Sequence, residues 1–133
     1  MIVEIPVSPG ELVDKLTILE IKLKEITDTT KLVNIQSEYS LLQETLTQKI
    51  TISEELLEAF LSLKEELLAV NKRIWDSENE VREFWNDDAR FIAGAKQSHF
   101  YNDERSRIKR AISSLLGSTI IEEKSHPKYE HTV

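Results

Sequence analysis

The chain has 133 residues, of which 40% are hydrophobic and 31% charged, with three Gly, three Pro and no Cys. This composition predicts a single folded domain over residues 1–133 and excludes disulfides, thiol nucleophiles and cysteine metal sites. No stretch approaches the roughly 18 consecutive apolar residues of a membrane span. The first residues also lack the pattern of a secretory signal, so we expect a cytoplasmic protein.

The net charge of −7 is unevenly distributed along the chain. Residues 1–66 carry all of it, whereas residues 67–133 hold equal numbers of acidic and basic side chains and every arginine. Four of the cations fall within residues 105–110. An acidic chain does not favour general nucleic-acid binding, which usually requires a basic protein, but it leaves a local anion site open.

The first residues predict a short edge strand followed by a helix. Residues 2–7 are rich in β-branched side chains and include a proline, which suits an edge strand. Ser8 is placed as the N-cap of the helix and Pro9 at its first position. Glu11 stands three residues after the cap and completes a capping box. We expect this helix over residues 9–26.

Apolar residues lie on two sides of this first helix. Leu12, Leu16 and Leu19 begin a stripe at helical spacing, and Ile18 and Ile21 fall on the far side. A helix that is apolar on two faces is buried on both of them. The pattern therefore places it either at the centre of a bundle or at a contact between subunits.

Three further helices are expected, over about residues 31–49, 56–84 and 89–116. The longest run has the clearest pattern, an unbroken seven-residue repeat in which Ser77 is the one polar member. The predicted fold class is therefore all-α: a four-helix bundle-like domain with long heptad-patterned helices.

The end of the chain is expected to be less regular than the helices. Gly117 stands where a left-handed residue closes a helix. Residues 119–121 are expected to form a second short strand beside residues 2–7, which gives at most a small two-stranded sheet from the termini. Residues 125–133 are polar and predict a flexible tail.

Polar residues border the apolar face of the last helix. Asn102, Arg105 and Lys109 follow one another at helical spacing beside that face. Such a row of donors favours a phosphate or a carboxylate, because Arg and Lys make charge-assisted hydrogen bonds to anions. The alternative is a solvated helix face whose side chains pair within the helix.

Polar residues on the other helices extend this candidate site. Asn71 interrupts the apolar side of the third helix, and an antiparallel hairpin of the last two helices would bring it near Asn102. Such a pair either binds a ligand or fixes the register of the two helices. Glu20 lies at the edge of the leucine stripe and requires a cation, for which Lys109 or Arg105 is the expected partner.

The sequence assigns no reaction, no cofactor and no metal site. It has no glycine-rich phosphate loop and no nucleophile in a triad motif, and His99, His126 and His131 lack metal-ligand spacing. Glu80 and Glu83 resemble half of the magnesium site of helical nucleotide pyrophosphatases, but the second carboxylate pair is missing. The candidate ligand-binding residues are Lys15, Glu20, Asn71, Asn102, Arg105 and Lys109.

Four segments together resemble one protein family. They are residues 8–22, Asn71 with Trp75, residues 102–103 with 108–110, and residues 116–118 with 122–125. Over nearly its whole length the chain is similar to a family of small bacterial and phage proteins of unknown function. The resemblance implies no established activity. It does imply a connection with surface-polysaccharide assembly, because such proteins are often encoded beside or fused to glycosyltransferases.

Two classes of function remain open. The two-faced first helix, the long heptad repeat and the resemblance favour a non-enzymatic helical module that binds a partner protein, or itself as a homodimer. The alternative is a small-molecule or anion-binding protein, enzymatic or not, that uses the candidate polar residues. Nucleic-acid binding through residues 105–110 is disfavoured by the net charge and by the lack of interleaved aromatic residues.

Overall fold

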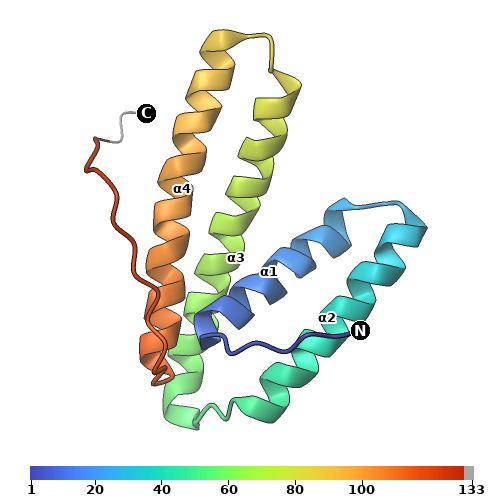
Figure 1. The fold of residues 1–133 in the computed structure, drawn as a ribbon, viewed down its shortest axis with the longest axis vertical. Helices are drawn as coiled ribbons and strands as arrows, with labels where there is room; N and C mark the ends of the chain where they lie inside the picture. The colour runs from blue at the N-terminus through green and yellow to red at the C-terminus, as the bar shows by residue number, and fades with distance from the viewer. Residues whose placement is uncertain (131–133) are drawn as a thin grey trace.

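A computed structural model describes residues 1–130, and the predicted all-α fold is confirmed (Figure 1). The helices are α1 (Pro9–Glu25), α2 (Thr29–Lys49), α3 (Glu54–Glu83) and α4 (Asp88–Leu115), with every boundary within two residues of its predicted position. Each helix in the described part is too short or too polar to act as a membrane span. His131 and the end of the expected tail lie outside the described residues.

The four helices form two hairpins (Figure 1). The long α3–α4 hairpin is one of them, and α1 with α2 forms the other. Within residues 1–130, α1 closely approaches each of the other three helices, whereas α2 closely approaches α1 alone. Leu16 and Ile21 are both buried, and Ile18 is half-buried. The prediction that both faces of α1 are covered is therefore confirmed.

The core lies where α1 crosses the α3–α4 hairpin. Val13 and Leu16 of α1, Leu67 of α3 and Ile112 of α4 are completely buried there. The members of the seven-residue repeat of α3 are all buried or half-buried, and Phe60, Leu67 and Val70 among them belong to this core. Burial of these side chains supplies the main free energy that holds the two hairpins together.

The strands predicted at the two ends are not found in the described residues. Residues 2–7 form an extended arm that leaves α1 toward α2, and residues 118–130 run along α4 (Figure 1). The Tyr129 hydroxyl donates a hydrogen bond to Asp103 of α4. The two end segments diverge, so neither supplies the other with the backbone partner that a strand requires.

Local signals at the helix ends are confirmed. The Ser8 hydroxyl accepts a hydrogen bond from the Glu11 backbone N–H at 3.2 Å, as expected of an N-cap. Gly117 has a φ of 69°, which places it in the left-handed region. The Ser118 N–H reaches the Ser113 carbonyl at 2.8 Å and the Gly117 N–H reaches the Ser114 carbonyl at 3.2 Å, which is a Schellman motif.

Candidate functional site

The first turn of α1 lies directly on the backbone of α4. The Gly10 N–H donates to Ser113 Oγ at 3.0 Å. A Cβ atom on Gly10 would lie 2.2 Å from the carbonyl oxygen of Lys109, so only glycine permits this approach. The contact brings the acidic first turns of α1 onto the cationic row of α4.

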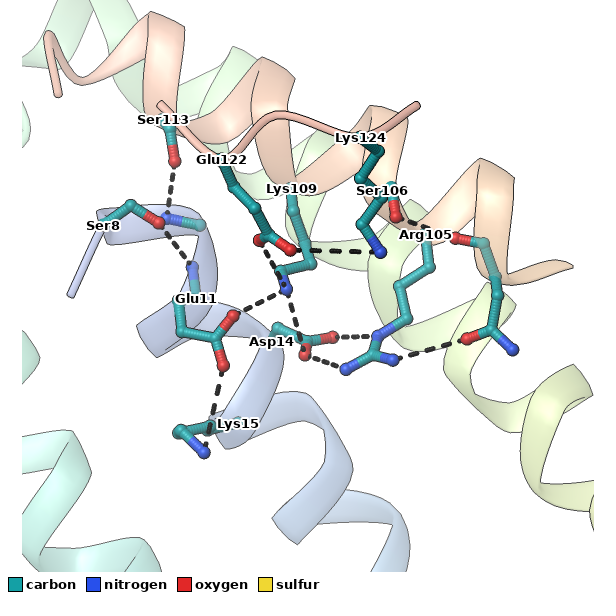
Figure 2. Close-up of polar contacts among 12 residues, drawn as sticks. Ser8, Glu11, Asp14, Lys15, Arg105, Ser106, Lys109, Ser113, Glu122 and Lys124 are labelled. Atoms are coloured by element: carbon teal, nitrogen blue, oxygen red, sulfur yellow. Dashed lines mark hydrogen bonds and ion pairs between the residues drawn. The ribbon is translucent and has the colours of Figure 1, made fainter. Parts of the chain in front are cut away.

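Asp14 is the buried centre of the polar cluster between these helices (Figure 2). Only 1% of the residue is exposed. Its Oδ1 accepts hydrogen bonds from Arg105 Nε and Asn71 Nδ2, each at 2.9 Å, and its Oδ2 accepts one from Arg105 Nη2. Lys109 Nζ lies 3.9 Å from Oδ2. One carboxylate therefore connects α1 to both α3 and α4.

The environment of Asp14 keeps this carboxylate ionised. Burial by itself raises the pKa of Asp14, because it removes water from the charged form. The hydrogen bonds from Arg105 and Asn71, with the charges of Arg105 and Lys109, outweigh burial and leave the pKa below its usual 3.8. The hydrogen bond with Asp14 also raises the pKa of Arg105. Asp14 is therefore unsuited to act as a general acid near neutral pH.

Glu11 also pairs with α4 and forms only part of the predicted capping box. Its Oε2 lies 2.6 Å from Lys109 Nζ, and its Oε1 lies 3.9 Å from Lys15 Nζ. The carboxylate thus turns toward the cations instead of returning to the backbone N–H of Ser8. The physical reason is that a close ammonium group attracts a carboxylate more strongly than a neutral N–H does.

Glu20 lies outside this cluster, so its predicted pairing with Lys109 or Arg105 is wrong. Its Oε1 lies 3.2 Å from Lys64 Nζ on α3. Six residues separate Glu20 from Asp14, which is about 9 Å along the helix axis, so Glu20 is beyond the reach of the two cations.

The two asparagines do not form the predicted direct pair. Asn71 Nδ2 donates to Asp14 Oδ1 and to Thr17 Oγ1, both at 2.9 Å. Asn102 Oδ1 instead lies 3.4 Å from Arg105 Nη1. Hydrogen bonds therefore link Asn71 to Asn102 indirectly, through Asp14 and Arg105.

The structure brings four of the six candidate residues together around Asp14. They are Asn71, Asn102, Arg105 and Lys109. Lys15 lies at the edge of this group, paired with Glu11, and Glu20 lies apart. The two cations among the four, Arg105 and Lys109, are already paired with carboxylates of α1. A ligand-binding role for the six candidate residues stays a prediction.

Sequence reasoning did not include Asp14 among the candidate residues. The signal that could have found it is the spacing of Gly10, Asp14, Thr17 and Ile21, which lie four, three and four residues apart. These residues share one face of α1, and that face is buried. An acidic residue on a buried face requires a cation from another element.

A pocket of about 370 Å³ lies beside this cluster. It is enclosed by the N-cap of α1, the C-terminal half of α4 and the segment 118–124 that follows α4. Serine hydroxyls and cationic side chains make up most of its lining, so we call it the serine pocket. Lys109 belongs both to its lining and to the cluster around Asp14.

Comparison with known protein families identifies the family of this chain. A family of unknown function, DUF6165, matches residues 1–132. The chain belongs to the DUF6165 family. Membership of a family of unknown function agrees with the resemblance seen in the sequence. Neither a curated protein nor a solved structure matches this DUF6165 chain.

Proposed function

We propose that this DUF6165 protein is a homodimeric interaction module. The observation that supports the proposal most directly is its large surface. The chain exposes 9644 Å². A compact monomer of 15.4 kDa is expected to expose about 7,200 Å². A typical stable interface takes about 800 Å² from each partner, so the surplus is sufficient for one.

Part of the exposed surface is apolar. Ile2, Val3 and Ile5 on the N-terminal arm are 69–75% exposed. Leu57 and Leu61, one turn apart on α3, are each almost half exposed. Exposed apolar groups of this kind are typical of surfaces that associate.

A second copy of the same chain is the occupant we propose for this surface. The arm extends away from α1 and has no strand partner among residues 1–130 (Figure 1). In a two-fold dimer each arm packs on the other protomer. The same apolar residues are therefore buried on both protomers. The proposed contact consists of the arm together with Leu57 and Leu61.

The family resemblance adds a cellular context to the proposal. It implies that the dimer, which we place in the cytoplasm, works beside enzymes of surface-glycan assembly. This part rests on the resemblance alone. Its test is direct binding between the purified protein and a purified glycosyltransferase encoded next to it, measured by calorimetry.

Sedimentation equilibrium at tens of micromolar tests the dimer. We expect twice the chain mass of 15.4 kDa for the wild type. The double change Ile5→Asp and Leu61→Asp should give the single-chain mass with unchanged helicity, because both side chains are exposed in one protomer. Ile92→Asp, at an exposed site on α4 away from the proposed contact, is the matched control and should stay dimeric. A wild-type protein of single-chain mass contradicts the proposal.

A further inference from the structure

The serine pocket contains two buried hydroxyl groups that have hydrogen-bond capacity to spare. Ser8 and Ser113 line the pocket and are each only 8% exposed. Each oxygen accepts a hydrogen bond from the first turn of α1: Ser8 from the Glu11 N–H and Ser113 from the Gly10 N–H. A hydroxyl that accepts a bond still has its hydrogen to donate, and accepting strengthens that donor. Within residues 1–130, neither serine donates its hydroxyl hydrogen to a protein acceptor.

The pocket is cationic although the whole chain is acidic. Its charged lining residues are Arg107, Lys109, Arg110, Lys124 and a single carboxylate, Glu122. No carboxylate of residues 1–130 pairs with Arg107. Arg110 lies 3.4 Å from Glu123, but both side chains are more than half exposed. An exposed pair of this kind contributes little free energy, so both guanidinium groups are available to an anion.

Glu122 pairs with two cations of the pocket (Figure 2). Its Oε2 lies 3.5 Å from Lys109 Nζ, and its Oε1 lies 3.9 Å from Lys124 Nζ. The Glu122 side chain is 54% exposed and belongs to the irregular segment after α4. It can therefore move into solvent when a stronger anion enters, whereas Glu11 continues to pair with Lys109.

We propose that the serine pocket binds a phosphate monoester. The phosphate group accepts hydrogen bonds from Ser8 and Ser113, pairs with Arg107 and displaces Glu122 from Lys109. Phosphate suits this lining better than a carboxylate does, because it has three acceptor oxygens and close to two negative charges at neutral pH. An arginine fork also matches phosphate geometry.

The remaining volume accommodates the organic group of the ester. A pocket of about 370 Å³ is larger than a phosphate group requires. Ile120 and Ile121 supply an apolar side of the lining. All lining residues come from one chain, so the proposed binding does not depend on the homodimer.

Calorimetric titration of the full chain tests the site. The probes are inorganic phosphate, glucose 6-phosphate, glycerol 3-phosphate and AMP, with glucose as the uncharged control. We expect at least one ester to bind at one site per chain. Arg107→Gln should weaken its binding about tenfold, because it removes charge-assisted hydrogen bonds. Glu122→Gln should tighten it, because the internal competitor is removed.

Arg82→Gln is the matched control for charge. It makes the same change in net charge on an exposed arginine of α3 that pairs with Glu78 of its own helix, and it should leave binding unchanged. Vesicles of phosphatidic acid, compared with phosphatidylcholine, distinguish a lipid headgroup from a free metabolite, and binding of either supports the phosphate monoester. Failure of every phosphate probe, or equal weakening by Arg82→Gln and Arg107→Gln, overturns the proposal.

Discussion

Asp14 of α1 and Arg105 of α4, 91 positions apart in the chain, form a two-pronged ion pair. The guanidinium donates through Nε to one carboxylate oxygen and through Nη2 to the other. Asn71 of α3 donates to the same carboxylate. This arrangement restricts how α1 can rotate against the hairpin, because a two-pronged pair tolerates less rotation than a single bond.

Replacement of this carboxylate should strongly destabilise the fold. Asp14→Asn leaves the charges of Arg105 and Lys109 with fewer partners at a buried position. We expect the free energy of unfolding in urea to fall by about 3–5 kcal/mol. Asp76→Asn is the matched control, since Asp76 pairs with Lys72 at an exposed site on α3. It should cost at most about 1 kcal/mol, and equal losses for the two variants would contradict a special role for Asp14.

The stabilisation that Asp14 provides should decrease at acidic pH. Its pKa in the folded protein lies below the usual 3.8, so the unfolded chain binds its proton first as the pH falls. The stabilisation by Asp14 is thus fully present above about pH 5 and is lost as the pH falls through the folded pKa. We expect the difference in unfolding free energy between wild type and Asp14→Asn to shrink from pH 6 to pH 3. A difference that stays constant over this range argues against a lowered pKa.

The contact of Gly10 with α4 should not tolerate a side chain. A Cβ at this position meets the Lys109 backbone at 2.2 Å, so Gly10→Ala should push α1 away and cost about 3 kcal/mol or more. Gly117→Ala is the comparison, because no atom lies within 4 Å of its Cβ and only its positive φ opposes the change. It should cost about 1–2 kcal/mol. Thermal unfolding followed by circular dichroism measures both, and a Gly10→Ala protein as stable as wild type rules out the close approach.

Arg107, in the lining of the serine pocket, should contribute little to stability. The Arg107 side chain is exposed and makes no ion pair within residues 1–130. Arg107→Gln should therefore change the unfolding free energy by less than about 0.5 kcal/mol in urea. A large loss would show that Arg107 supports the fold, and the weaker phosphate binding expected of this variant would then have a structural cause.

The amino-acid sequence determined the helices of this protein, because helix signals act over three or four residues. Ser8 caps α1 and Gly117 closes α4 through their immediate neighbours. The seven-residue repeat likewise identified the inward face of α3. The strands predicted at the ends were wrong, since a strand depends on a distant partner and the two ends diverge.

Only the tertiary structure decided which charges meet. The sequence singled out Glu20 as needing a cation and offered Arg105 or Lys109 as its partner, but it could not rank residues that lie about 90 positions apart. The close approach at Gly10 selects Glu11 and Asp14 for the cations of α4, and the rise along α1 leaves Glu20 to Lys64. The direction in which two helices cross depends on the packing of the whole core, so no local pattern encodes it.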